Sequence, residues 1–243
     1  MSTKKIALIT GANKGIGLET ARQLGQQGIT VLAGARDEIK ANKAAEDLRK
    51  AGLDVHGIVI DVNNADSIQK AAARIERDYG RLDILVNNAG VMLDDPKKKP
   101  SEQSLEVWRK TFETNLFGLV ATTQALLPLL RKSAAGRIVN LSSILGSIHF
   151  HATPGSPVYD FKLPAYNVSK SAVNAYTVQL AYELKDTTIK VNAAHPGWVK
   201  TELGGEGATM DIPDGAKTSV ALATIGADGP NGAYMHMGET LPW

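Results

Sequence analysis

Short apolar runs alternate along the chain with longer segments in which apolar residues recur every three or four positions. The apolar runs are typical of strands that are buried on both faces, and the longer segments have the period of amphipathic helices. The runs predicted as strands are residues 4–10, 30–35, 56–60, 82–88, 136–143, 189–197 and 232–237. The segments predicted as helices are residues 15–28, 38–51, 65–79, 105–132, 164–186 and 211–225.

This alternation predicts an α/β fold. Strands too apolar to face water require helices on both sides, so we expect a doubly wound parallel sheet of about seven strands in a three-layer α/β/α arrangement. No linker interrupts the pattern, and residues 1–243 are predicted to form a single domain. Pro128 should kink the long helix 105–132 or end it early, whereas Pro164 suits the first turn of the next helix.

Composition and charge exclude several classes of protein. Of the 243 residues, 43% are hydrophobic and 21% charged, as in ordinary globular proteins. A net charge of +2 is too small to indicate nucleic-acid binding, and the basic run 97–99 follows two aspartates. The absence of cysteine excludes disulfides and thiolate ligands. No apolar segment has the length of a signal sequence or a membrane span, including the N-terminal residues 1–5, so we expect a cytoplasmic protein without membrane contact.

A glycine-rich turn, TGANKGIG at residues 10–17, follows the first predicted strand and opens the first helix. Backbone N–H groups at the positive end of a helix bind a pyrophosphate well. The spacing of Gly11, Gly15 and Gly17 differs from the usual G-x-G-x-x-G, and a tight turn alone would also use glycine. The position of the turn after the first strand favours a dinucleotide site.

Two cations lie where a dinucleotide site distinguishes NADP from NAD. An acidic residue after the second strand binds the ribose 2′-hydroxyl of NAD, and a cation there accommodates the 2′-phosphate of NADP. Here Ala35 closes that strand and Arg36 follows it, while Lys14 lies in the glycine-rich turn. The pair therefore favours NADP(H). The alternative is a solvated Lys14 and an Arg36 that pairs with Asp37.

A tyrosine and a lysine, Tyr166 and Lys170, are spaced by one helical turn in the sequence YNVSK. Residues at this spacing share a helix face, and a neighbouring cation should lower the pKa of the phenol towards acid–base work near neutral pH. The pair alone is better explained as a buried tyrosine and a solvated lysine, because this spacing is common.

Polar residues at two other strand ends favour a functional site at Tyr166 and Lys170 over this explanation. Ser142 and Ser143 end the strand 136–143, and only one of them should point into a given site, because side chains alternate along a strand. The sequence NNAG, residues 87–90, ends another strand. Ligands of α/β sheets bind at such strand ends.

Together these residues resemble the classical short-chain dehydrogenase/reductase family over nearly the whole chain, which implies a Rossmann-like fold. In order, the matching pieces are TGANKGIG, Arg36, Asp61-Val62, NNAG, Asn115, Ser143, Tyr166 with Lys170, and HPGWVKT at 195–201. Within the family the chain is most similar to NADP-dependent carbonyl reductases. The pieces that carry this closer similarity are GANKGIGLE, ARD after the second strand, NLFG, GRIVNLSS, PGWVKT and the final Trp243.

The resemblance implies a cofactor role for residues from every strand end. They are Gly11, Asn13, Lys14, Gly15, Ile16, Gly17, Arg36, Asp61, Val62, Asn88, Ala89, Gly90, Tyr166, Lys170, Pro196, Gly197, Val199 and Thr201. In this assignment Lys14 and Arg36 hold the 2′-phosphate, and Asp61 and Val62 flank the adenine. Asn87, next to the cofactor residues, is expected to brace the sheet instead.

The resemblance also implies four catalytic residues. Tyr166 is the general acid in carbonyl reduction, Lys170 holds the nicotinamide ribose and lowers the pKa of Tyr166, and Ser143, the second serine of its pair, hydrogen-bonds the substrate oxygen. Asn115 supports a proton-relay water. The predicted function is therefore NADPH-dependent reduction of a ketone or aldehyde. Reduction of an activated C=C bond, and an NADP-binding sensor without turnover, remain alternatives.

The chain departs from the family pattern between Ser143 and Tyr166, where the gap is roughly ten residues longer than usual. We expect this insertion, residues 149–164, to form a wall of the substrate pocket opposite Trp198, with a surface loop as the alternative. Two histidines in it, without a third ligand, do not predict a metal site. Apolar candidates suggest a bulky or aromatic carbonyl substrate: Leu145, Phe150 and Trp198. A homo-oligomer and a monomer both remain open.

Overall fold

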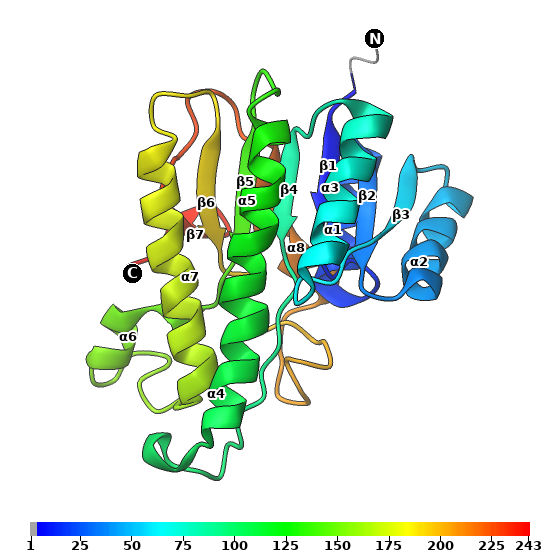
Figure 1. The fold of residues 1–243 in the computed structure, drawn as a ribbon. Coiled ribbons are helices and arrows are strands. Elements are labelled where there is room, and N and C mark those ends of the chain that lie inside the picture. Colours follow the sequence, from blue (N-terminus) through cyan, green and yellow to red (C-terminus); the bar gives the residue numbers. More distant parts are fainter. Residues whose placement is uncertain (1–3) are drawn as a thin grey trace.

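An eight-stranded sheet forms the centre of the molecule in the computed structural model, which describes residues 4–243 (Figure 1). Residues 1–3 of the predicted domain and N-terminus lie outside the described residues. The strand order is β3-β2-β1-β4-β5-β6-β7-β8. The strands are β1 (Ile6–Ile9), β2 (Thr30–Ala35), β3 (Val55–Val59), β4 (Ile84–Asn87), β5 (Arg137–Leu141), β6 (Lys190–Ala194), β7 (Tyr234–His236) and β8 (Glu239–Thr240).

All strand pairs from β3 to β7 are parallel, as the alternation with helices predicted. The eighth strand is a short antiparallel addition, in which Glu239 and Thr240 return along β7. These two residues are polar and exposed, so their sequence has no apolar run that would predict a strand.

The side chains of each strand are divided between two cores. Ile6 and Leu8 of β1 pack into one core, and Ala7 and Ile9 pack into the other. Successive side chains of a strand point to opposite faces of a sheet, so a strand that is apolar at every position needs cover on both sides.

Three helices cover each face. The helices α3 (Ala65–Tyr79), α5 (Gly118–Leu130) and α7 (Pro164–Glu183) contribute to the first core, and lie in front of the sheet in Figure 1. The second core receives side chains from α1 (Gly15–Gln26), α2 (Glu38–Lys50) and α8 (Ile212–Thr224). The predicted three-layer, doubly wound arrangement is confirmed.

The predicted long helix 105–132 is not one regular helix. It consists of α4 (Leu105–Phe112), a π-helical turn (Glu113–Phe117) and α5. Pro128 does not end the helix, because α5 continues past it to Leu130, two residues before the predicted end at residue 132. Gln124, whose carbonyl loses a partner to the proline, is exposed, so water can satisfy it.

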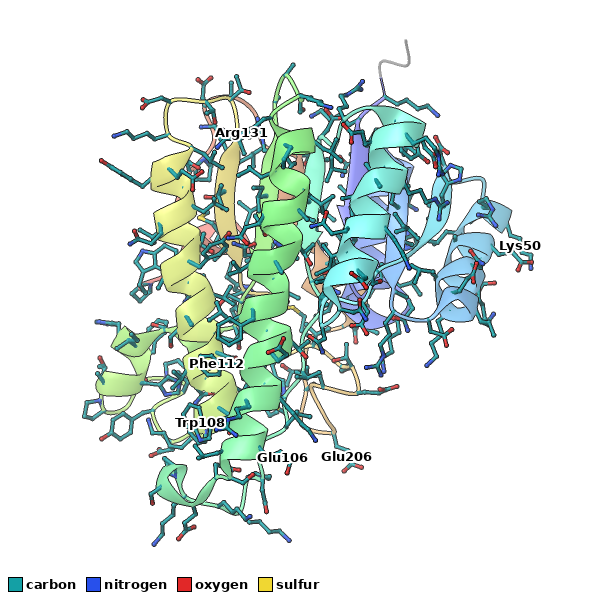
Figure 2. The ribbon with its side chains drawn as sticks, in the orientation of Figure 1. Lys50, Glu106, Trp108, Phe112, Arg131 and Glu206 are labelled. Carbon is teal, nitrogen blue, oxygen red and sulfur yellow. The ribbon has the colours of Figure 1, made fainter. Side chains whose placement is uncertain are left out.

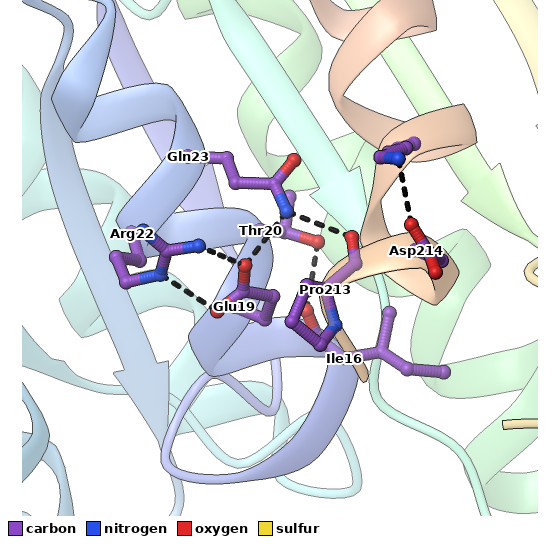
Figure 3. A network of polar contacts seen from close by, with 8 residues as sticks. Ile16, Glu19, Thr20, Arg22, Gln23, Pro213 and Asp214 are labelled. Atoms are coloured by element: carbon purple, nitrogen blue, oxygen red, sulfur yellow. Dashed lines mark hydrogen bonds and ion pairs between the residues drawn. The ribbon is translucent and has the colours of Figure 1, made fainter. Parts of the chain in front are cut away.

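Polar contacts tie the glycine-turn helix α1 to α8 (Figure 3). Glu19 accepts hydrogen bonds from Arg22 Nε (2.8 Å) and Gln23 Nε2 (2.7 Å). Gln23 also donates to the carbonyl oxygen of Pro213 at the start of α8 (2.9 Å). These contacts fix the helix whose N-terminus follows the glycine-rich turn.

The loops after the strands gather at one edge of the sheet, which is the lower edge in Figures 1 and 2. Figure 2 shows Trp108 and Phe112 on α4 beside the N-terminal half of α7, with their ring centroids 6.1 Å apart. Glu206 lies on the long loop that follows β6. Because parallel strands end at the same edge, segments far apart in the sequence meet there.

Candidate active site

The glycine-rich turn has the backbone geometry that a bound dinucleotide requires. Gly11 and Gly15 have φ values of 64° and 56°, a region that favours glycine. A Cβ atom on Gly17 would lie 2.4 Å from Asn88 Nδ2 and 2.5 Å from the carbonyl oxygen of Gly11. No larger side chain fits there, so glycine lets the turn pack closely against Asn88 after β4, and the N-terminus of α1 lies at the strand ends, where a pyrophosphate binds in such sheets. Asn13 and Ile16 line the same turn and are half-buried.

Asn88 and Ala89 join the glycine-rich turn to the end of β4. Asn88 Nδ2 donates to the carbonyl oxygens of Thr10 (2.8 Å) and Gly11 (3.1 Å). The backbone N–H groups of Asn88 and Ala89 both donate to Thr10 Oγ1 at 3.0 Å. Asn87 is buried and donates to Thr123 and Asn140, both at 2.9 Å, so it braces the sheet as predicted.

The loop after β6 closes the same edge from the other side. The methyl group of Thr201 would lie 3.4 Å from a Cβ atom on Gly15, so this loop and the glycine-rich turn face each other closely. Pro196 and Val199 are buried, and Gly197 has a φ of 93°. The structure therefore places these predicted cofactor residues opposite the turn.

The two predicted 2′-phosphate ligands lie at the surface. Lys14 forms an exposed ion pair with Glu202, and Arg36 follows β2 as an exposed residue with no ion pair in residues 4–243. Surface ion pairs contribute little free energy, so the pairing with Glu202 would not prevent Lys14 from binding a phosphate. Asp61 and Val62 are half-buried and follow β3 at the same edge. The predicted pairing alternative for Arg36 fails, since Asp37 instead caps α2 by accepting from Lys40 N–H (2.9 Å).

Tyr166, Ser143 and Lys170 are brought together under the sheet edge. The Ser143 side chain lies close enough to the Tyr166 phenol to lower its pKa, and Lys170 Nζ lies 5.7 Å from the centre of the tyrosine ring. Lys170 is 4% exposed and its Nζ donates to the carbonyl oxygen of Leu141 (2.7 Å). The alternative of a solvated lysine is therefore excluded.

The pKa of Tyr166 is raised, whereas the sequence analysis expected the neighbouring Lys170 to lower it. Burial raises the pKa of Tyr166 to about 12, and the hydrogen bond with Ser143 offsets only part of that rise. Burial also lowers the pKa of Lys170 to about 8, because a buried ammonium loses its hydration. Burial thus sets the direction of both shifts, and it keeps the phenol protonated at neutral pH.

The two serines at the end of β5 point in different directions. Ser142 is 2% exposed, and its hydroxyl faces the carbonyl oxygen of Lys170 (3.5 Å) inside the protein. Ser143 is half-buried, accepts the N–H of Leu145 (3.2 Å) and contacts Tyr166. The alternation of side chains along a strand explains why only one serine reaches the phenol.

Asn115 lies in the π-helical turn and is 1% exposed. Its side chain accepts from Val91 N–H and donates to the Val91 carbonyl, both at 2.8 Å, and it also donates to Ser169 Oγ (2.9 Å). A Cβ atom on Gly90 would lie 3.4 Å from Asn115 Oδ1 and 3.6 Å from Lys170 Nζ. Asn115 is therefore next to the cluster, and π-helical turns often occur at functional sites.

Comparison with known proteins agrees with this geometry. The model of the short chain dehydrogenase family matches residues 5–211. The chain belongs to this family. A short-chain dehydrogenase, anuI, from Penicillium roqueforti is 40% identical in an alignment that covers 93% of this chain and 90% of that protein. Carbonyl reductase [NADPH] 1 from Rattus norvegicus is 31% identical in an alignment that covers 100% of this chain and 99% of that protein.

Solved structures give the same result. The NADPH-bound carbonyl reductase from chicken fatty liver has a TM-score of 0.85 and 26% sequence identity, and the match covers 99% of both chains. The Rossmann-like fold predicted from the resemblance is thus confirmed, and the chain is a short-chain dehydrogenase/reductase with carbonyl reductases among its relatives.

Two residues that the sequence analysis missed hold the Ser143 turn of this short-chain dehydrogenase. His195 Nδ1 accepts the N–H groups of Ile144 (3.1 Å) and Gly197 (3.3 Å). The Tyr234 hydroxyl donates to the Ser143 carbonyl oxygen from β7. No motif indicates these contacts, because they join residues 51 and 91 positions apart.

The protonation of His195 should make the stability of the protein depend on pH. Burial, with a smaller effect of the neighbouring His236, lowers the pKa of His195 to about 3 from a usual value of 6.5. The unfolded chain therefore binds a proton between these values that the folded protein does not, and stability is lost as the pH falls through this range. We expect about 2 kcal/mol less stability at pH 5 than at pH 7 from this group.

Urea unfolding at both pH values measures this difference. The variant His195→Asn places an amide oxygen near the position of Nδ1 and does not titrate, so its stability should change less between pH 7 and pH 5. An unchanged difference in this variant would contradict the assignment of the pH dependence to His195.

The insertion 149–164 reaches the loop after β6. It begins within a short helix, α6 (Ile148–Ala152), where a loop was expected, and continues as turns. Phe161 from the insertion and Trp198 are each half exposed, and their rings meet edge to face at 6.3 Å. Leu145 and Phe150, the other apolar candidates, are half-buried.

Neither a metal site nor a membrane span is found in the described part of the chain. Within residues 4–243, no group of three or more potential ligands could hold a metal ion. His151 Nε2 instead lies 3.0 Å from the Leu145 carbonyl oxygen, and the backbone N–H of His149 donates to Trp243. Among the same residues, no helix combines the length and apolarity needed to cross a bilayer.

Proposed function

We propose that this short-chain dehydrogenase reduces ketones or aldehydes to alcohols with NADPH. The observation that carries the proposal is the buried cluster of Tyr166, Ser143 and Lys170 at the strand ends beside the glycine-rich turn. The names of relatives support the cofactor, since the rat relative is a carbonyl reductase [NADPH] and the chicken enzyme was solved with NADPH.

The residues of this chain fit NADPH. The turn from Gly11 to Gly17 would receive the pyrophosphate, because its N–H groups stand at a helix N-terminus and no Cβ atom blocks it. Lys14 and Arg36 would hold the 2′-phosphate, with no acidic residue at the end of β2 to repel it. When bound, NADPH supplies the hydride, which is chemistry that no side chain provides.

The side chains of the cluster would stabilise and protonate the negative charge that develops on the substrate oxygen. Tyr166, protonated because burial raises its pKa, donates its proton to that oxygen. Ser143 donates a hydrogen bond to the same oxygen, which stabilises the developing charge. Lys170, buried and anchored at Leu141, contributes positive charge near the phenol and would hold the nicotinamide ribose. Asn115 would support a water that returns a proton to Tyr166.

The substrate is proposed to be bulky or aromatic. Phe161 of the insertion and Trp198 present two half-exposed rings beside one another, and Leu203 and Leu93 are exposed apolar side chains on the loops of the same edge. Apolar and aromatic surface is the usual lining of small-molecule sites. This arrangement supports the predicted role of the insertion as a wall of the pocket.

Oxidation of NADPH and NADH, measured side by side with aryl ketones, small aliphatic ketones, aldehydes and enones, tests the proposal. We expect turnover of aryl ketones with NADPH, with kcat/KM at least about tenfold lower for NADH, because the loss of charge-assisted hydrogen bonds worth about 1.4 kcal/mol costs a factor of ten. The double variant Lys14→Ala/Arg36→Ala should lose most of this preference. Lys43→Ala, a cation of α2 paired with Asp47, is the matched control.

Each other outcome has a distinct meaning. Equal use of both cofactors would contradict the 2′-phosphate assignment but not the reductase. Turnover of enones alone would replace C=O by C=C reduction, and tight NADPH binding without turnover of any substrate would indicate the sensor. Preference for small aliphatic ketones would contradict the aromatic wall.

A further inference from the structure

The helix that carries Tyr166 begins without a capping side chain of its own. Leu163 occupies the N-cap position of α7 and has no side chain that can accept a hydrogen bond, and Pro164 follows as the first helical residue. The N–H groups of the next two residues, Ala165 and Tyr166, therefore lack partners within the helix. Buried N–H groups without partners would cost stability and leave the first turn free to fray.

Asp94 supplies the missing cap from a different part of the chain. Its Oδ1 accepts the N–H of Ala165 (2.8 Å), and its Oδ2 accepts the N–H of Tyr166 (3.0 Å). These are the two N–H groups that an N-cap aspartate would normally reach from within the helix. The carboxylate is half-buried and stands at the positive end of the helix, where a negative charge is favourable.

The position of Asp94 connects the cap to the cofactor edge. Asp94 lies four residues after Gly90 in the sequence NNAGVMLD, on the loop that leaves β4. The Asn115 side chain hydrogen-bonds the backbone N–H and the carbonyl oxygen of Val91 on the same loop. The loop is thus fixed at Val91 and at Asp94, and the second of these attachments is to the backbone of Tyr166 itself.

We propose that Asp94 is a positioning residue that sets the place of the Tyr166 phenol. The proposal rests on the proposed function of Tyr166 as the proton donor. Because one carboxylate holds the backbone N–H of Tyr166, movement of the first turn of α7 would move the phenol relative to Ser143, which is attached to β5. Reacting groups must be aligned closely, and a displacement of about 1 Å can cost about 100-fold in rate.

Comparison of Asp94→Ala with wild type tests the inference through kcat and NADPH affinity. We expect kcat to fall by about tenfold or more, with the NADPH Kd from fluorescence titration changed less than about twofold, because Asp94 touches neither the glycine-rich turn nor Thr201. Asp95→Asn is the matched control, since Asp95 is the neighbouring residue and its exposed carboxylate accepts the N–H of Lys97 (3.0 Å) on its own loop and no N–H of α7. It should retain wild-type kcat.

A cap restored within the helix should rescue the defect. In the double variant Asp94→Ala/Leu163→Asp, the new aspartate stands at the N-cap position and can accept the same two N–H groups. We expect kcat to recover to within about threefold of the single variant Leu163→Asp, a non-additive result that a general loss of stability would not produce.

Amide hydrogen exchange tests the geometry independently of turnover. Exchange at Ala165 and Tyr166 should accelerate in Asp94→Ala and slow again in the double variant, while exchange in the middle of α7 stays unchanged. Unchanged exchange at these two amides, or an Asp94→Ala enzyme with wild-type kcat beside an inactive Tyr166→Phe, would overturn the role of Asp94. An active Tyr166→Phe would instead overturn the proposed function.

Discussion

Replacing Tyr166 by phenylalanine should lower kcat for ketone reduction by about a thousandfold, because general acid catalysis contributes about 100- to 10,000-fold. The phenol is the proposed proton donor of the cluster, since Ser143 is a far weaker acid and the Lys170 ammonium is held by the carbonyl oxygen of Leu141 (2.7 Å). The ring of phenylalanine fills the same buried space at 6% exposure, so the fold and the neighbouring Lys170 should be undisturbed. Stopped-flow and steady-state oxidation of NADPH measure the effect.

Two further measurements separate loss of chemistry from loss of binding. The NADPH Kd of Tyr166→Phe should stay within about threefold of wild type, as expected when an interaction acts mainly in the transition state. Tyr182→Phe is the control for removal of a hydroxyl from the same helix, because Tyr182 is 68% exposed on α7 and far along the chain from the cluster. Retention of wild-type kcat by Tyr166→Phe would contradict the role of the phenol as the acid.

The arrangement of layers could be predicted from the sequence because burial on both faces leaves a clear pattern. A strand such as β1, with Ile6 and Leu8 in one core and Ala7 and Ile9 in the other, must be apolar throughout and must be followed by a covering helix. The cluster of Tyr166, Lys170 and Ser143 was predicted through the family resemblance, because the spacing of Tyr166 and Lys170 alone favoured a solvated lysine; the alternation of strands and helices explains only where these residues meet. Each residue occupies a strand end or a helix face that this alternation already places at one edge.

Features that depend on tertiary contacts were not predictable in the same way. The π-helical turn Glu113–Phe117 replaces regular helix with no glycine or proline among its own residues. The cap provided by Asp94 joins residues 71 and 72 positions apart, and the aspartate pair at 94 and 95 is typical of any solvated loop. The pattern of apolar and polar residues indicates local secondary structure, whereas these contacts depend on how the loops pack against each other.

The sign of the pKa shift of Tyr166 is the clearest case of that limit. Helical spacing correctly placed Lys170 beside the phenol, and attraction between opposite charges alone would lower the pKa. Burial acts on both groups in the opposite direction, raising the pKa of Tyr166 to about 12 and lowering that of Lys170 to about 8. Spacing along a helix reports proximity but not the depth at which the pair lies.

The two serines of β5 allow the electrostatic part of the mechanism to be tested with a built-in control. Ser143→Ala should lower kcat by about 100-fold, because removal of one hydrogen-bond donor to a developing oxyanion costs about 100- to 1000-fold. Ser142→Ala should keep kcat within about threefold, since its hydroxyl faces the carbonyl oxygen of Lys170 (3.5 Å) inside the protein, whereas Ser143 is the serine that acts on Tyr166. The two substitutions remove the same atoms from adjacent residues.

We expect the free energy of unfolding to fall more in Ser142→Ala than in Ser143→Ala, the reverse of their order in lost activity. Ser142 is the more buried serine, at 2% exposure, so its loss should lower the free energy of unfolding by about 1 kcal/mol, the usual value of one hydrogen bond. Urea unfolding and ketone reduction measured on both proteins therefore form a cross-comparison. An inactive Ser142→Ala beside an active Ser143→Ala would reverse the assignment, whereas equal activity of both would mean that the donor to the substrate oxygen is Tyr166 alone.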